Sequence, residues 1–96
     1  MIEVEVKSIL NIKSITGNKD SQYIHLKDKS SVKDALDKLV EIYGEELERN
    51  IYDDKNNTKK GITILHNGSS ILAKRGLDTE LKDKDRILIF PPVGGG

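Results

Sequence analysis

Hydrophobic residues alternate with charged ones at the start of the chain, and this spacing predicts a strand. Ile2, Val4 and Val6 fall on one face of an extended segment, and charged residues separate them. The apolar signal continues through residues 9–15, before the polar stretch 16–20 forms a loop. A second strand fits residues 22–26. The connection between the two strands is longer than a two-residue hairpin, so the sequence leaves their register open.

A helix is predicted over residues 32–43, because apolar residues recur there every three or four positions and form one stripe. The stripe consists of Val32, Ala35, Leu36, Leu39, Val40 and Tyr43. Ser31 and Asp34 form a short version of the Ser-x-x-Glu capping box, and Gly44 supplies a left-handed C-cap. Residues 45–51 can add a second short helix, and the polar residues 53–60 form a solvated loop.

The period of two returns after Gly61 and predicts a hairpin. Ile62, Ile64 and Leu65 lead into Asn67-Gly68, a pair that accepts the positive φ angles of a tight turn. The second hairpin strand then includes the apolar pair 71–72. Residues 76–81 form an irregular crossing segment, and residues 82–85 form a charged turn. Alternation is lost over 86–90, which predicts a central strand that is buried on both faces.

The order strand, strand, helix, strand, strand, strand predicts an α+β fold with two layers. One main helix has a single apolar stripe, and a mixed sheet of four to five strands is the economical partner for it. The apolar last strand is expected to lie centrally and to pair in parallel with the first strand across a long connection. This arrangement is a β-grasp, the ubiquitin-like architecture. We expect one domain over residues 1–90, followed by a flexible C-terminal segment over residues 91–96.

The charge and composition of the 96-residue chain exclude several classes of function. Sixteen basic residues balance sixteen acidic ones, so there is no net attraction to nucleic acid or to anionic lipid. The absence of cysteine excludes a disulfide framework and a thiolate metal cluster. The longest apolar run has four residues, Ile87 to Phe90, too few for a membrane span or a signal-peptide core. We therefore expect a soluble, cytoplasmic domain.

Residues that could do chemistry in the body of the domain are few. His25 and His66 are the two histidines, and both are interpreted as surface or strand-end residues, because no third metal ligand accompanies them. The adjacent carboxylates of the chain, such as Asp53 and Asp54, lie in exposed segments without the apolar setting that separates two pKa values for acid–base work. The sequence therefore predicts no metal site and no catalytic centre of its own.

The C-terminal segment is unusual in composition. Pro91 and Pro92 follow the predicted central strand directly, and proline cannot donate to a strand ladder. Val93 and three glycines complete the chain, and a backbone without Cβ atoms can enter a narrow channel. A glycine tail alone would be interpreted as a frayed terminus or an expression scar. Joined to two prolines and a central strand, it instead predicts a segment that presents its terminal carboxylate to another protein.

The segment from Leu81 to Gly96 resembles the C-terminus of the MoaD family. The shared pattern is an acidic turn, an apolar strand, Phe-Pro-Pro-Val, one variable residue and a final Gly-Gly; the variable position here is Gly94. The hairpin at 64–68 and the segment 76–79 resemble the archaeal-type branch of that family. The loop 53–60 and the long 8–20 connection depart from its shorter bacterial members.

This resemblance implies a sulfur carrier that does not itself catalyse a reaction. In such carriers an ATP-dependent adenylating enzyme of the ubiquitin-activating type activates the terminal carboxylate, here that of Gly96, and sulfur then replaces AMP to give a thiocarboxylate. The second implied partner is a MoaE-like large subunit of molybdopterin synthase, which uses the sulfur to form the molybdopterin dithiolene. No cofactor is implied for the chain itself, since ATP and the sulfur source belong to the activating partner.

The resemblance also implies roles for residues at the end of the chain. Gly96 would carry the reacting carboxylate, and Gly94 and Gly95 would have to stay slim inside a partner channel. Pro91, Pro92 and Val93 would set the direction in which the segment leaves the domain. Phe90 is expected either to pack in the core or to contact a partner.

Other functions remain open at this point. The chain could be a ubiquitin-like modifier that is joined through Gly96 to lysines of other proteins. A carrier of the thiamin pathway shares the Gly-Gly end, although that family runs shorter and lacks Phe-Pro-Pro-Val. A plain binding module with an incidental tail is the simplest alternative.

Overall fold

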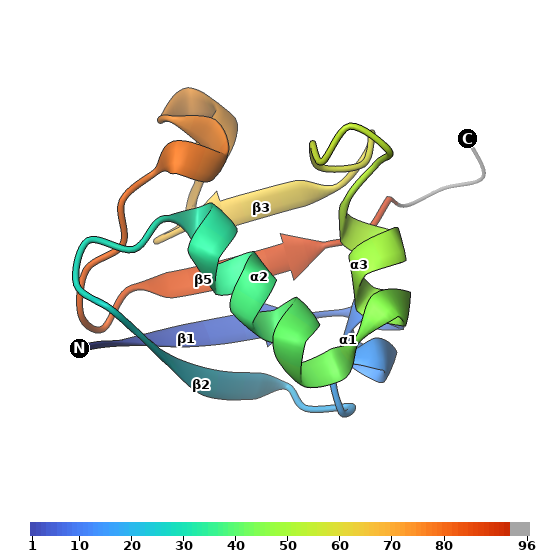
Figure 1. Ribbon diagram of the computed structural model, residues 1–96, viewed down its shortest axis with the longest axis horizontal. Helices are drawn as coiled ribbons and strands as arrows, with labels where there is room; N and C mark the ends of the chain where they lie inside the picture. Colours follow the sequence, from blue (N-terminus) through green and yellow to red (C-terminus); the bar gives the residue numbers. More distant parts are fainter. Residues whose placement is uncertain (93–96) are drawn as a thin grey trace.

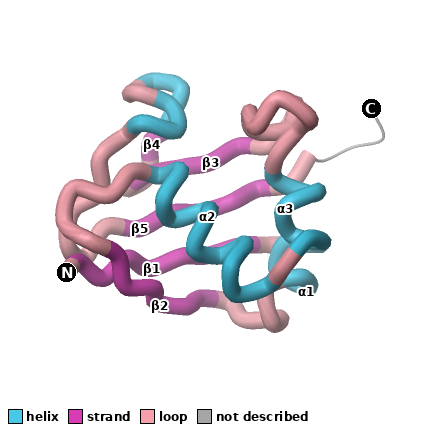
Figure 2. Tube along the Cα trace, viewed as in Figure 1, coloured by secondary structure: helices cyan, strands magenta, loops and turns pink. Residues whose placement is uncertain are grey.

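The computed structural model describes residues 1–92, and its five strands form one mixed sheet in the order β2-β1-β5-β3-β4. All three α-helices lie on the same side of this sheet (Figure 1 and Figure 2). This is the predicted β-grasp. In chain order the elements are β1 (Ile2–Ser8), α1 (Leu10–Ile15), β2 (Ser21–Leu26), α2 (Val32–Tyr43), α3 (Glu45–Ile51), β3 (Thr63–His66), β4 (Ser69–Ser70), two short 3-10 helices, η1 (Ile71–Ala73) and η2 (Gly76–Asp78), and β5 (Arg86–Phe90).

Strand β5 lies at the centre of the sheet, as predicted. It pairs in parallel with β1, where Val6 lies beside Ile87, and antiparallel with β3, where Ile64 lies beside Ile89. These four side chains are buried beneath the helices and form the middle of the core. Parallel pairing of two strands requires a long crossover, and residues 9–85 supply it with α2 on the way.

The prediction that β5 is buried on both faces is wrong. Ile87 and Ile89 are buried, but Leu88 and Phe90 are only half-buried and Arg86 is exposed. Successive side chains of a strand point to opposite faces, and helices cover only one face of this sheet (Figure 2). The apolar residues that break the alternation therefore lie on the open face of the sheet.

Helix α2 begins and ends where the sequence predicts. The side chain of Ser31 accepts the backbone N–H of Asp34 at 3.2 Å, and the Asp34 carboxylate accepts the backbone N–H of Ser31 at 2.9 Å, which completes the capping box. Gly44 ends the helix with φ of +90°. The short helix expected at 45–51 is also confirmed, and its Leu47 and Ile51 are fully buried.

Residues 10–15 form a helix, α1, where the sequence pattern predicts only a continued apolar segment. Its Ile12 is fully buried, and Thr16 closes the helix by donating its hydroxyl to the Ile12 carbonyl at 2.9 Å. The Thr16 hydroxyl also lies 3.0 Å from the hydroxyl of Ser8, at the end of β1. A helix of six residues is too short for its apolar period to stand out in the sequence.

The hairpin at Asn67-Gly68 is confirmed, with φ of +51° and +89° at its two central residues. Its second strand is shorter than expected, because β4 ends at Ser70. The Ser70 hydroxyl accepts the backbone N–H of Leu72 at 3.2 Å and turns the chain into a 3-10 helix. The apolar pair 71–72 therefore does not continue the strand: Ile71 is buried, whereas Leu72 is exposed.

Truncation of Leu36 tests the core beneath α2. Leu36 is fully buried, so Leu36→Ala should lower the free energy of unfolding by about 2–5 kcal/mol through lost burial and the remaining cavity. The matched control is Leu72→Ala, because Leu72 is 85% exposed and its truncation should change stability by less than about 0.5 kcal/mol. Urea denaturation measures both. Equal losses from the two variants would contradict this core.

Candidate functional site at the exit of the C-terminal segment

The candidate site is the point where the chain leaves the sheet at the end of strand β5. The strand is paired on both sides up to Ile89, which lies between Ser8 of β1 and Ile64 of β3, and its last residue, Phe90, lies beside Thr63 of β3. Pro91 follows and is fully buried, and because it has no N–H group it cannot extend the ladder. The strand therefore ends in a fixed position, beside the connection between α3 and β3 (Figure 1).

Gly61 lies close to Pro92 just after β5, a proximity that no pattern in the sequence predicts. Its φ is +91°, and a Cβ atom placed on it would lie 3.0 Å from Pro92 Cβ and 3.2 Å from Pro92 Cγ. Glycine is thus favoured for two reasons, its backbone conformation and the close approach of the proline ring. The sequence indicates the importance of this position only through the place of Gly61, between the polar loop and the apolar strand.

The loop that precedes Gly61 is exposed but held by its own hydrogen bonds. The Asp53 carboxylate accepts the backbone N–H groups of Lys55 at 2.8 Å and Asn57 at 3.0 Å, which forms an Asx-type turn. The backbone N–H of Lys59 donates to the carbonyl of Ile51, the last residue of α3, at 2.7 Å. The prediction of a solvated loop is confirmed, and these bonds return the chain to Gly61 in a defined direction.

Tyr52 connects the start of this loop to α2 through a side-chain hydrogen bond. Its hydroxyl donates to the Asp37 carboxylate at 2.9 Å, and the Lys33 ammonium lies 5.3 Å from the centre of its ring. Burial of the phenol, followed by the neighbouring Asp37, raises the pKa of Tyr52 well above its ordinary value. The tyrosine thus remains a hydrogen-bond donor at physiological pH, and the loop stays docked on the helix.

The predicted site residues divide between the described part of the chain and its end. Pro91 and Pro92 follow β5 directly, at the point where the chain leaves the sheet, and their role in setting the direction of the segment stays a prediction. Val93, Gly94, Gly95 and Gly96 lie outside the described residues, so their roles stay predictions. Phe90 is half-buried and shares the open face of the sheet with Leu88, two residues earlier; its contact with a partner also stays a prediction.

The open face of the sheet carries a shallow groove of about 220 Å³ in line with Phe90 along β5. Its lining residues are Lys7, Leu65, Gly68, Arg86, Ile87 and Leu88. Next to the groove, the Glu5 carboxylate accepts the Ser21 hydroxyl at 2.7 Å and pairs with the Arg86 guanidinium at 3.1 Å. The Ser21 hydrogen bond is the main cause that lowers the pKa of Glu5. The face therefore combines an apolar strip with neutralised charges.

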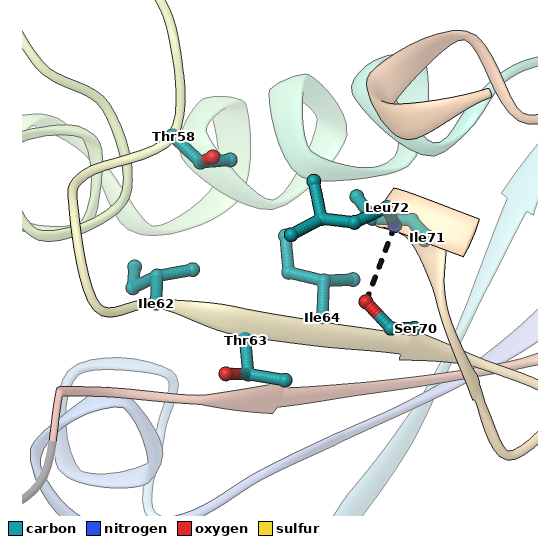
Figure 3. A pocket seen from close by; sticks show the side chains of 7 residues that line it. All are labelled: Thr58, Ile62, Thr63, Ile64, Ser70, Ile71 and Leu72. Carbon is teal, nitrogen blue, oxygen red and sulfur yellow. Dashed lines mark hydrogen bonds between the residues drawn. The ribbon is translucent and has the colours of Figure 1, made fainter. Parts of the chain in front are cut away.

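A second hollow lies at the edge of the sheet, between β3 and the loop that precedes it (Figure 3). It has a volume of about 80 Å³ and is lined by Thr58, Ile62, Thr63, Ile64, Ser70, Ile71 and Leu72. Small-molecule sites usually measure about 300–1,000 Å³, so this hollow is too small for a nucleotide. Its walls offer hydroxyl groups and methyl groups and no charged side chain.

The two histidines have different surroundings. His25 is exposed on β2, with its Nε2 3.4 Å from the Glu3 carboxylate, and the surface interpretation is confirmed for it. His66 lies at the end of β3, as predicted, but it is buried against Asp85 and Lys74 rather than exposed. Within residues 1–92, no three histidine, cysteine or carboxylate side chains lie close enough together to hold a metal ion.

None of the helices in this part of the chain is long and apolar enough to cross a membrane.

One family model, one curated relative and two solved structures are similar to this chain over most of its length. The model of the ThiS family matches residues 10–96. Small archaeal modifier protein 3 of Haloferax volcanii is 32% identical over 99% of this chain and 100% of that protein. The solution structure of small archaeal modifier protein 1 from Methanosarcina acetivorans is 35% identical over 100% of this chain and 98% of that one, with a TM-score of 0.83. A putative molybdopterin converting factor, subunit 1, from Pyrococcus furiosus is 26% identical over 97% and 100% of the two chains, with a TM-score of 0.75.

Substitution of Gly61 tests the contact that directs the exit of the chain. Gly61→Ala should lower the free energy of unfolding by about 1 kcal/mol or more, since the new methyl group meets Pro92 and the φ angle is unfavourable for alanine. It should also shift the amide resonance of Phe90 and remove the nuclear Overhauser contact between Gly61 and the Pro92 ring.

The control for this variant is Gly44→Ala, because Gly44 has a φ of +90° and no atom within 4 Å of an added Cβ. It should destabilise the protein through its backbone strain and leave the Phe90 resonance and the Pro92 contact in place. A Gly61→Ala protein with an unchanged Pro92 contact would show that Gly61 does not direct the exit.

Proposed function

The chain belongs to the ThiS family of ubiquitin-like sulfur carriers and modifiers, and from this premise we propose that it carries sulfur on its C-terminal Gly96. In the proposed role it is the small subunit of a molybdopterin synthase and donates its sulfur for dithiolene formation. The observation that carries the proposal is the end of β5, where a strand paired on both sides up to Ile89 runs through Phe90 into the buried Pro91. Support also comes from the likeness to a protein described as molybdopterin converting factor, subunit 1.

The chemistry begins at a carboxylate that is unreactive by itself. Attack of the Gly96 carboxylate on the α-phosphorus of ATP releases pyrophosphate and forms an acyl-adenylate, which contains a good leaving group. Hydrosulfide then adds to the acyl carbon and the bond to AMP breaks, which leaves a thiocarboxylate. ATP and the sulfur source are supplied by an adenylating partner of the ubiquitin-activating type, and this chain binds neither.

The contribution of this chain is to position and present the reacting group. The ladder hydrogen bonds of β5 fix the point of exit, and Pro91 with the Gly61–Pro92 contact fixes its direction. Four residues follow Pro92, of which three are glycines. Without Cβ atoms, such a segment can enter a channel whose walls would exclude any side chain. Gly94 and Gly95 are therefore proposed to be required for entry into the partner channel.

The open face of the sheet is the proposed contact surface for these partners. Phe90 and Leu88 are half-buried apolar side chains that no helix covers, and Leu65 lies beside Leu88 on β3. A partner that receives the C-terminal segment must lie close to the end of β5, and this strip leads there. The second proposed partner is a MoaE-like large subunit of molybdopterin synthase, which would take up the thiocarboxylate.

Mass spectrometry of the intact protein tests the sulfur chemistry. Incubation with a cognate adenylating enzyme, ATP and a sulfur donor should raise the mass by the difference between sulfur and oxygen, and the change should map to the C-terminal peptide. A variant extended by one alanine after Gly96 should show no change, because its last carboxylate is no longer on a glycine that fits the activating site. The control adds one residue before Met1, which is 84% exposed, and should react normally. An unreactive native chain in a reaction that converts a known carrier would refute the proposal.

Protein modification is the second candidate function, and the two small archaeal modifier proteins among the relatives favour it. Here the Gly96 acyl group is transferred from the adenylate or the thiocarboxylate to a lysine amine of another protein: an isopeptide bond forms, and AMP or hydrosulfide leaves. Digestion of cell lysate should then yield peptides in which a lysine carries the C-terminal residues of this chain. These peptides should disappear when Gly96 is deleted. Their absence from cells that make the intact chain would exclude this function and leave sulfur transfer unaffected.

A further inference from the structure

A hydrogen-bonded chain of three ionisable side chains lies at the opposite end of β3 from the exit site. His66 ends β3, where it pairs with Ile87, the second residue of β5. The imidazole Nε2 lies 2.7 Å from Asp85 Oδ2, and the Nδ1 lies 2.7 Å from Lys74 Nζ. Lys74 also donates to the His66 carbonyl at 3.0 Å. The hairpin, the end of η1 and the charged turn thus bring together residues from three separate segments.

The donors and acceptors of this chain fix the positions of the protons. A lysine ammonium can only donate, so His66 Nδ1 must carry a lone pair that faces Lys74. The other ring nitrogen, Nε2, therefore carries the proton and donates it to the Asp85 carboxylate. The carboxylate orients the imidazole, and the imidazole presents its basic nitrogen to an amine. In hydrolase triads a carboxylate orients a histidine, and the histidine takes a proton from a hydroxyl nucleophile. Here Asp85 and His66 hold the same two positions, and the amine of Lys74 stands in the place of the hydroxyl.

Asp85 is suited to stabilise a positive imidazole. Burial opposes its ionisation, but hydrogen bonds from the Asn67 amide at 3.0 Å, from His66 and from the backbone N–H of Lys82 at 2.8 Å outweigh the burial. Together they hold the pKa of the Asp85 carboxyl below its ordinary value. The carboxylate is thus ionised at neutral pH and faces the ring nitrogen that would share the charge of an imidazolium.

Lys74 donates to an imidazole nitrogen, whereas the other lysines with a charged partner in the described residues pair with carboxylates. Lys33 and Lys84 pair with the carboxylates of Asp37 and Glu3 at 2.8 and 3.0 Å, and Lys13 pairs with the carboxylate of Asp20. A carboxylate is a weak base that holds an ammonium in its charged form, whereas imidazole accepts protons near neutral pH. In the part of the chain that the structure describes, Lys74 is the lysine whose ammonium donates to an imidazole nitrogen.

Within this cluster Lys74 is exposed to solvent, whereas the imidazole of His66 that it contacts is largely buried. The side chains of His66 and Asp85 are only 10% and 13% exposed, whereas Lys74 lies on the surface, in the same short segment as the exposed Leu72. A reagent in solution can therefore approach the lysine from outside while water has little access to the ring. If the cluster only held the chain in place, it would not require a basic imidazole nitrogen next to the amine of Lys74.

We propose that Lys74 is an acylation site, at which activated acyl groups bound to phosphate are transferred to its amine with His66 as general base. The ammonium gives one proton to His66 Nδ1. The free amine then turns about the last bonds of the lysine side chain, so that its single lone pair faces away from the imidazole, and attacks the acyl carbon. A C–N bond forms, the bond from that carbon to the phosphate oxygen breaks, and the phosphate leaves with the electron pair. The second proton of the nitrogen passes to the phosphate, and His66 returns its proton to solvent. The substrate class is acyl phosphates and acyl-adenylates, and the inference rests on the cluster alone, independently of the proposed function.

Acetyl phosphate is the probe for this site. The full chain is incubated with it at neutral pH, and the acetylated fraction of each lysine is followed by peptide mass spectrometry. Lys74 should react at least about tenfold faster than Lys60, an exposed lysine of the 53–60 loop in the same molecule. Equal or slower reaction of Lys74 would overturn the proposal, because the two hydrogen bonds would then only hold the ammonium in place.

Two variants separate general-base action from a structural effect. His66→Gln removes the base and should lower the rate at Lys74 to that at Lys60, with the other lysines unchanged. Asp85→Asn keeps the base but removes the negative charge behind it, and should give an intermediate rate. A rise at all lysines in His66→Gln would mark unfolding, and the decision would then rest on the folded Asp85→Asn protein. A Lys74 rate in folded Asp85→Asn equal to that of the native chain would refute the relay.

Discussion

The pairing of β5 between β1 and β3 is the interaction on which the rest of this structure depends. Its hydrogen bonds place Ile87 and Ile89 against the helices, and they fix both ends of a five-residue strand. At one end the charged turn brings Asp85 to His66, and at the other Pro91 leaves the sheet. A strand paired on one side alone could fray at its last residues, and the direction of the chain beyond it would then vary.

The two-layer architecture decides where chemistry can occur. A chain of this size covers one face of its sheet with helices, and the apolar residues of the other face stay partly exposed. The hollows described at the sheet edge and on the open face are small or shallow, so the groups that can react lie at the margins of the domain. This is consistent with a protein whose role is to present groups to other molecules, and the Lys74 cluster is placed in the same way, at the rim.

Local signals predicted most of the fold. The capping box at Ser31 and the apolar stripe of α2, like the positive-φ pair Asn67-Gly68, act over a few residues, and the structure confirms them. The two failures have different causes. Helix α1 is too short for its apolar period to show in the sequence, and the exposure of one face of β5 depends on how many layers cover the sheet. Of the candidate site, Pro91 and Pro92 could be read from the residues, whereas Gly61 and the burial of His66 could not.

By itself, the sequence determined the chemistry available at the end of the chain. Proline lacks an N–H group and glycine lacks a Cβ atom wherever they occur, so these properties of residues 91–96 follow from residue identity. Only the tertiary structure decided which distant residues meet: Gly61 with the ring of Pro92, and His66 with Lys74 and Asp85. The reason is physical. Such contacts arise from strand register and from the return of a loop, which involve the packing of the whole domain, and no local pattern of residues encodes them.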